Sequence, residues 1–114
     1  MKWLVVGSRS ITHFDLSPYI PLDVDVLITG GAKGVDTLAE AYADMHKLSK
    51  IVLRPQYHRY GRGAPIQRNK AMVDLADCIL VIWDGNSKGS QTVVDYAHRT
   101  QKEVTVICVS ADKT

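Results

Sequence analysis

Short apolar runs recur along the chain, separated by polar segments that contain glycine. Five of these runs are rich in β-branched residues and are almost continuously hydrophobic, without the alternation of a half-exposed strand. This pattern is typical of strands that are covered on both faces of a sheet. The predicted strands are Trp3 to Val6, Val24 to Thr29, Ile51 to Leu53, Cys78 to Trp83 and Val104 to Val109.

Segments between the strands have the spacing of helices packed on a sheet. One helix is expected from Pro65, a favourable residue for a first helical turn, to about Ala76. Another begins near Ser90, and the short segment from Asp15 to Pro21 is expected to form one or two helical turns. The clearest apolar face contains Val35, Leu38, Ala39, Tyr42 and His46, and the last helix places Val93, Val94 and Ala97 inward.

Strands that alternate with helices in this way form a parallel sheet with right-handed crossovers. The predicted fold class is therefore α/β. We expect one Rossmann-like, three-layer domain over residues 1–114, with a five-stranded parallel sheet in the order 3-2-1-4-5 and helices on both faces. One long irregular segment is expected, from Pro55 to Ala64, and a loop of that length in a compact domain is usually functional.

All eight glycines lie in the four segments that follow the first four predicted strands. Because parallel strands end at the same edge of a sheet, these segments are expected to meet where open α/β sheets bind ligands. Glycine lets backbone N–H groups approach an anion, and a helix that starts there adds unpaired N–H groups. We expect Gly30 to Gly34 and Gly85 to Gly89 to hold phosphate, the alternative being tight turns between strand and helix.

Neither glycine-rich segment matches a common nucleotide motif. The stretch Gly30-Gly31-Ala32-Lys33-Gly34-Val35-Asp36 lacks the Gly-Lys-Ser/Thr ending that positions magnesium in a P-loop. Neither segment contains the G-x-G-x-x-G pattern of dinucleotide-binding folds. ATP hydrolysis and NAD redox chemistry are therefore disfavoured.

Arg68 falls near the start of the helix that begins at Pro65, where a cation opposes the helix dipole. A bound anion would compensate for this, so we interpret Arg68 as a fork for phosphate and Asn69 as a polar contact to the ligand. An ion pair with Asp36 or Asp84 across the crevice is the alternative. Arg9 and Arg62 are weaker candidates for the same role.

Two carboxylates complete the candidate site. Asp36 either caps the second helix or binds a ribose hydroxyl. Asp84, at the end of a strand, is a weak candidate for a general base, and no second carboxylate lies near it in the sequence. The expected ligand-binding residues are Gly7, Ser8, Arg9, Gly30, Gly31, Lys33, Gly34, Asp36, Arg62, Arg68, Asn69, Asp84, Gly85, Ser87, Gly89, Ser90 and Thr92.

The sequence predicts no metal site, disulfide or membrane contact. The four histidines have no metal-ligand spacing among themselves or with the cysteines. Cys78 opens one predicted strand and Cys108 closes the next, about 15 Å apart at ~3.3 Å per residue, so both are interpreted as small buried residues. No apolar run approaches the ~20 residues of a membrane span, and no export signal is visible, so we expect a cytoplasmic protein.

The motifs together resemble the SLOG superfamily of Rossmann-like domains, which includes the DNA-processing protein A (Smf) and LOG families. They are most similar to the small stand-alone YspA-core-like proteins. The resemblance covers residues 3 to 109 and rests on Val5-Val6-Gly7-Ser8-Arg9, Ile28 to Asp36, Tyr60 to Asn69 and Gly85 to Thr92. It implies a domain that binds nucleotides or nucleotide-derived ligands such as ADP-ribose, roles as a sensor in bacteria or phages, and a homo-oligomer.

Three functions stay open at this point. LOG enzymes that cleave the N-glycosidic bond carry Gly-Gly-x-Gly-Thr-x-x-Glu, and the matching stretch here, Asn86 to Val93, has no glutamate at that position. We therefore expect ligand binding or sensing with no required cofactor, ahead of a nucleotide-processing enzyme that uses Asp84 or Asp36. Binding of single-stranded nucleic acid is the third, although a net charge of +2 is modest. It would use Arg59, Arg62, Arg68 and Lys70, with Tyr57 and Tyr60 as stacking platforms.

Overall fold

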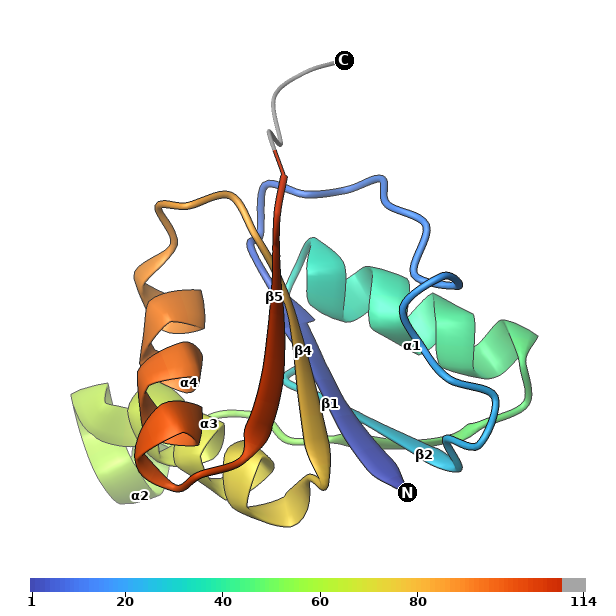
Figure 1. The fold of residues 1–114 in the computed structure, drawn as a ribbon. Coiled ribbons are helices and arrows are strands. Elements are labelled where there is room, and N and C mark those ends of the chain that lie inside the picture. Colours follow the sequence, from blue (N-terminus) through green and yellow to red (C-terminus); the bar gives the residue numbers. More distant parts are fainter. Residues whose placement is uncertain (110–114) are drawn as a thin grey trace.

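A five-stranded parallel sheet forms the centre of the molecule (Figure 1), in a computed structural model that describes residues 1–109. The strands lie in the order β3-β2-β1-β4-β5, and all four neighbouring pairs are parallel. The fold class, the strand order and the direction of the strands are therefore confirmed. The strands are β1 (Lys2–Gly7), β2 (Val26–Thr29), β3 (Ser49–Val52), β4 (Cys78–Trp83) and β5 (Glu103–Cys108).

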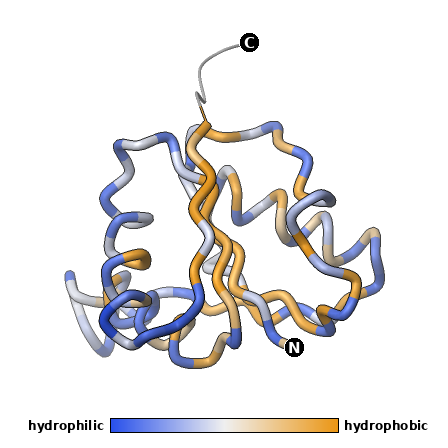
Figure 2. Tube along the Cα trace, viewed as in Figure 1, coloured by the Kyte–Doolittle hydropathy of each residue, from blue (hydrophilic) through white to orange (hydrophobic). Residues whose placement is uncertain are grey.

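Helices cover both faces of the sheet, as predicted. On one face, α1 (Val35–Met45) packs over β1, β2 and β3, and its core includes Val35 and Ala39 together with Leu80 of β4. On the other face, α3 (Ala64–Leu75) and α4 (Lys88–Arg99) share a core that includes Met72 and Val93. Figure 2 shows the hydrophobic residues concentrated along the central strands, between these two layers.

The inner face predicted for α1 is confirmed at its start and fails at its end. Val35 and Ala39 are fully buried, and Leu38 and Tyr42 pack against the same core. His46 follows the last turn as the C-cap residue and is exposed. Its ring stacks on Tyr42 with the ring centroids 4.1 Å apart, so it extends the apolar surface of α1 without entering the core.

The segment from Asp15 to Pro21 forms turns, and the predicted helical turns are wrong. The carboxylate of Asp15 accepts hydrogen bonds from the N–H and the hydroxyl of Ser17, at 3.0 and 2.6 Å, which stabilises a turn. Pro18 follows and has no N–H to give to a helix. The segment still contributes to the core next to α1, where Leu16 and Ile20 are 3% and 4% exposed.

The segment from Pro55 to Ala64 is more regular than expected. It contains the short helix α2 (Tyr57–Tyr60) and the single 3₁₀ turn η1 (Gly61–Gly63), which lead directly into α3. No residue of α2 or η1 is buried. Because these turns bury no apolar side chain, the hydrophobic spacing that identifies a packed helix is missing from their sequence.

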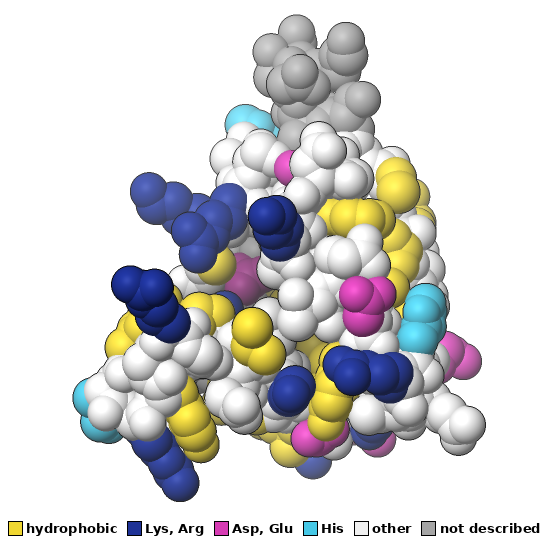
Figure 3. All heavy atoms as spheres, turned by 90° about the vertical axis from the view of Figure 1, so that its left-hand side faces the viewer, with side chains coloured by type: hydrophobic (Ala, Val, Ile, Leu, Met, Phe, Trp, Pro, Cys, Tyr) yellow, Lys and Arg dark blue, Asp and Glu magenta, His cyan; other side chains and the backbone are white. Residues whose placement is uncertain are grey.

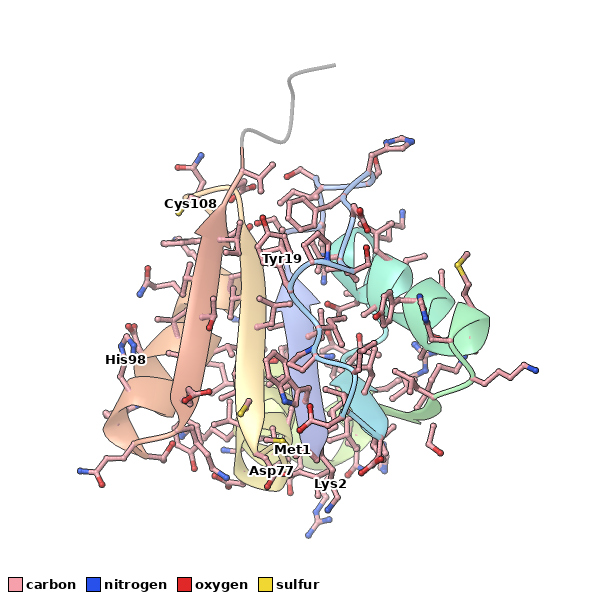
Figure 4. The ribbon with its side chains drawn as sticks, turned by 45° about the vertical axis from the view of Figure 1, so that its right-hand side comes forward. Met1, Lys2, Tyr19, Asp77, His98 and Cys108 are labelled. Carbon is pink, nitrogen blue, oxygen red and sulfur yellow. The ribbon has the colours of Figure 1, made fainter. Side chains whose placement is uncertain are left out.

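Both cysteines are free thiols, but only one is buried. Cys78 lies opposite Glu103 and Cys108 lies opposite Trp83, so the two thiols are at opposite ends of the β4–β5 pair. Cys78 is buried as expected, whereas Cys108 is exposed on the edge strand (Figure 4), which corrects the expectation for it. Within residues 1–109, no helix has the length and apolar character to cross a membrane.

Candidate functional site

A cleft of about 450 Å³ opens at the carboxyl-terminal edge of the sheet, on the face covered by α3 and α4. Its apolar floor contains Val6 of β1, Met72 of α3 and Val93 of α4. The strands β1 and β4 are neighbours, and their onward connections run to opposite sides of the sheet. The cleft is therefore at the topological switch point, where open α/β sheets bind their ligands.

The first turn of α4 presents unpaired backbone donors to this cleft. Ser87 is the N-cap residue, and its side chain makes no capping hydrogen bond to the helix. In the part of the chain that the structure describes, the N–H groups of Lys88, Gly89 and Ser90 have no protein acceptor. All three residues line the cleft. This turn therefore offers three donors and the positive end of the helix dipole to an anion.

Hydrogen bonds between the segments after β1 and β4 hold that turn in place. Ser8 is 1% exposed, and its hydroxyl oxygen accepts a hydrogen bond from the N–H of Asp84 at 2.9 Å. The hydroxyl groups of Ser8 and Ser87 are 2.7 Å apart. Because its hydroxyl is used in this way behind the cleft wall, Ser8 positions the turn and is not part of the cleft lining.

Asp84 lines the cleft and organises the start of α4. Its Oδ1 atom accepts hydrogen bonds from the N–H groups of Asn86 and Ser87 at 2.8 and 3.0 Å, and its Oδ2 atom accepts one from the hydroxyl of Ser10 at 2.9 Å. These donors, that of Asn86 foremost, hold the pKa of Asp84 far below its usual value. A carboxylate this acidic is a weak proton acceptor at neutral pH, which disfavours Asp84 as a general base.

Asp36 closes the turn between β2 and α1 and does not cap the helix. It is 4% exposed, and its Oδ2 atom accepts hydrogen bonds from the N–H groups of Gly30 and Ala32, at 3.0 and 3.3 Å. The start of α1 has no side-chain cap, so the capping interpretation is wrong. Burial raises the pKa of Asp36, although the donors at Ala32 and Gly30 and the charge of Arg68 oppose the shift.

The two glycine-rich segments differ in how many of their backbone N–H groups are free to bind a ligand. Two N–H groups of the segment from Gly30 to Gly34 already bind a carboxylate, whereas the first turn of α4 has its donors free. Gly34 has a φ of +78°, and a Cβ atom there would overlap the carbonyl oxygen of Ser8. Tight packing thus explains Gly34, and a phosphate contact of this segment stays a prediction.

Arg68 lines the cleft but binds mainly to the protein backbone. Its Nη1 atom donates to the carbonyl oxygens of Gly30 and Leu53, at 2.7 and 3.3 Å, and its Nε atom donates to Oδ1 of Asn69 at 2.8 Å. Among residues 1–109 it forms no ion pair within 4 Å, so the ion pair with Asp36 or Asp84, the alternative to a phosphate contact, is absent. Its Nη2 atom donates to no group of the described chain.

The predicted site residues divide into two groups. Those that line the cleft are Gly7, Arg9, Asp36, Arg68, Asn69, Asp84, Ser87, Gly89 and Ser90. Those that do not are Ser8, Gly30, Gly31, Lys33, Gly34, Arg62, Gly85 and Thr92. Arg62 lies in η1, away from the rim, and the hydroxyl of Thr92 donates to the carbonyl oxygen of Lys88 at 2.9 Å within α4.

Four further rim residues were missed: Ser10, Ala32, Pro65 and Lys88. Lys88 and Ala32 lie within the glycine-rich segments, and Ser10 follows Arg9. The segments that predicted the other rim residues therefore also contain these three. Position along the chain located the segments that form the rim but not each residue that lines it, and the apolar floor required knowledge of the helix packing.

Cations outnumber carboxylates around the cleft. Arg9, Arg68 and Lys88 line it, against Asp36 and Asp84. Figure 3 shows Lys and Arg side chains beside a hollow on this face, with an acidic side chain inside it. Over the described ranges, no group of three or more His, Cys, Asp or Glu side chains could hold a metal ion.

Residues 17–60 match the model of a protein family described as the YspA, cpYpsA-related SLOG family. The matched stretch runs from before β2 to α2 and includes the segment from Gly30 to Asp36. This match confirms the resemblance to the SLOG superfamily and supports membership of it. Comparison with curated proteins and with solved structures gave no match.

Proposed function

We propose that the protein binds a nucleotide or a nucleotide-derived ligand through a phosphate group in the cleft between β1 and β4. The observation that carries this proposal is the free first turn of α4, whose N–H groups at Lys88, Gly89 and Ser90 open onto the cleft. The match of residues 17–60 to a SLOG family model supports a nucleotide-related role in general terms. ADP-ribose, a ligand of the type that the sequence resemblance implies, is one member of this ligand class.

In the proposed complex, the phosphate lies against the first turn of α4. Lys88 and Arg9 add positive charge from the rim, and the Nη2 atom of Arg68 is available as a further donor. Anionic groups bind best where unpaired N–H groups and cations converge. A cleft volume of about 450 Å³ is within the usual range for small-molecule sites.

The apolar floor supports a nucleoside as the rest of the ligand. Val6, Met72 and Val93 give a surface on which a base or sugar can pack, and Asn69 at 7% exposure provides a polar group beside it. The Oδ1 atom of Asn69 is bound by Arg68, so its amide nitrogen is the group left for the ligand. The proposal therefore places the base or sugar next to α3 and the phosphate next to α4.

We propose binding or sensing without a chemical step. Two properties of the carboxylates support this: the low pKa of Asp84 makes it a poor base, and Asp36 is already bound by two N–H groups. The glutamate of the LOG-type motif is also missing from Asn86 to Val93. Incubation with nucleoside monophosphates and NAD, followed by chromatography, tests this; release of free base would contradict it.

Calorimetry with AMP, ADP, NAD and ADP-ribose, combined with two variants of Lys88, tests the binding site itself. Lys88→Ala removes the side-chain charge and keeps the N–H, whereas Lys88→Pro removes both. Proline suits this first helical position, because the preceding Ser87 has an extended backbone with a ψ of 122°. We expect Lys88→Pro to bind roughly tenfold more weakly than Lys88→Ala, the usual scale for one charge-assisted hydrogen bond.

Arg62→Ala is the matched control, because Arg62 carries the same charge and lies outside the cleft. It is expected to bind as the wild type does. Equal affinities of Lys88→Pro and Lys88→Ala would show that the α4 turn does not bind the phosphate. Absence of binding by all four ligands would contradict the proposed function.

A further inference from the structure

A second cleft, of about 440 Å³, lies on the side of α3 that faces away from the first cleft. Its walls come from the segment after β3, from α2, from α3 and from the later part of α4. Arg68 lines both clefts and therefore lies between them.

The second cleft has an excess of positive charge. Arg54, Arg59, Arg68 and Lys70 line it, with Asp74 as the one carboxylate among its lining residues. The Oδ1 atom of Asp74 accepts a hydrogen bond from the hydroxyl of Tyr96 at 2.9 Å. In the described structure, none of the four cations is within 4 Å of a carboxylate. This cleft is therefore suited to an anion with more than one charge.

Aromatic rings lie beside these cations. The guanidinium carbon of Arg59 is 5.2 Å from the centre of the Tyr60 ring, and the ammonium nitrogen of Lys70 is 5.8 Å from the centre of the Tyr96 ring. Tyr60 is 43% exposed, so part of its ring is open to a ligand. Cations next to aromatic rings are the combination that binds a phosphate together with a stacked base.

Arg68 connects this surface to the first cleft. Its Nη1 and Nε atoms hold Gly30, Leu53 and Asn69, which fixes the guanidinium plane between the two clefts. A ligand that fills the first cleft and extends past Arg68 enters the second cleft, which Arg59 and Lys70 line.

We propose that the second cleft binds a second nucleotide unit, so that the preferred ligand contains two linked nucleotides and spans Arg68. This inference rests on the proposed function, because the first unit occupies the first cleft. Arg59 and Lys70 bind the phosphate of the second unit, and Tyr60 provides a stacking surface for its base. A mononucleotide fills the first cleft alone and does not use these three residues.

The test compares AMP with the 5′-phosphorylated deoxyadenosine dinucleotide and trinucleotide by calorimetry, for the wild type and two variants. Arg59→Ala/Lys70→Ala removes two cations of the second cleft, and Arg62→Ala removes a nearby cation that lines neither cleft. Arg59 is exposed and Lys70 is half-buried, and their side chains contact the rings of Tyr60 and Tyr96 without a hydrogen bond in the described chain, so the double variant is expected to fold. Thermal unfolding of each variant checks this.

We expect the dinucleotide to bind at least tenfold more tightly than AMP, and the trinucleotide no more tightly than the dinucleotide. The gain should disappear in Arg59→Ala/Lys70→Ala, persist in Arg62→Ala, and fall more steeply with salt than AMP binding does. Binding of AMP should be the same in all three proteins.

The two proposals fail in different ways. If AMP binds but the dinucleotide binds no more tightly, or if its gain survives in Arg59→Ala/Lys70→Ala, the second nucleotide site is ruled out and the first cleft stands. Affinity that continues to rise with the trinucleotide contradicts a two-unit ligand. If none of AMP, ADP, NAD and ADP-ribose binds, the proposed function fails, and the inference built on it fails with it.

Discussion

The Oδ2 atom of Asp36 accepts a hydrogen bond of 3.0 Å from the N–H of Gly30, which joins the first turn of α1 to the end of β2. Both groups are buried. An ionised carboxylate loses its hydration when it is buried. The fold therefore holds the charged form of Asp36 where burial disfavours it. The stability of the fold and the shape of the candidate site thus depend on the same carboxylate.

Asp36→Asn is expected to change how stability depends on pH. Burial raises the pKa of Asp36 above 3.8, so the folded protein binds this proton more readily than the unfolded chain does. Its contribution is complete below pH 3.8 and is lost as the pH rises through the folded pKa. The measurement is therefore the free energy of unfolding by denaturant between pH 3.5 and 7. Its slope against pH should be more positive for Asp36→Asn than for the wild type. Identical slopes would show that the pKa of Asp36 is not raised.

Asp84→Asn is expected to show the opposite linkage. The pKa of Asp84 is lowered, chiefly by the N–H of Asn86, so its stabilisation is present above pH 3.8 and is lost as the pH falls toward the folded pKa. The variant should be less stable than the wild type at pH 7, and the two should converge in acid. Urea titrations at pH 7 and pH 2.5 measure this difference, and a gap that widens in acid would contradict it.

Gly7→Ala and Gly89→Ala are expected to have opposite effects on stability. A Cβ atom at Gly7 would overlap the carbonyl oxygen of Ile82 and the side chain of Val35, so we expect a loss of about 3 kcal/mol or failure to fold. At Gly89 a Cβ atom would meet nothing within 4 Å outside its own helix backbone, and alanine favours the helix by up to about 1 kcal/mol. Thermal unfolding compares the two, and equal effects would show that packing does not distinguish these glycines.

Arg68→Lys keeps the charge but cannot reproduce the fork between Gly30, Leu53 and Asn69. We expect a loss of roughly 1–3 kcal/mol, because half-buried carbonyl oxygens lose their donor. Arg9→Lys, an exposed rim position without these bonds, is the control and should stay within ~0.5 kcal/mol of the wild type. A loss as large in the control would mean that the backbone contacts of Arg68 contribute little.

Interactions within one element could be predicted from the sequence, and those between distant residues could not. The continuous apolar runs gave the strands, because burial on both faces leaves a direct record in the sequence. Arg68 donates to Gly30, which is 38 positions away, and no local pattern reports that contact. Asp36 was interpreted as a cap or a ribose contact for a different reason: its partners Gly30 and Ala32 are near in sequence, but the N–H groups that it binds precede the helix and depend on how the turn after β2 closes.

The candidate site shows the same division. The segments after β1 and β4 were predicted to meet, because parallel strands must end at one edge. Some backbone N–H groups at this edge are already bound by the carboxylates of Asp84 and Asp36. The folded structure is needed to tell which N–H groups remain free. The sequence therefore indicates the location of the cleft, while the availability of its donors is a property of the folded chain.

The connection from β1 to β2 has a consequence for the order of folding. It contains turns where the later connections contain α1, α3 and α4, so it has no repeating local hydrogen bonds that could form first. Its core residues Leu16 and Ile20 belong to the cluster that α1 and the central strands complete. Because contacts between distant residues follow local ones, we expect this connection to be added late, onto a nucleus built from the helical units that come after it.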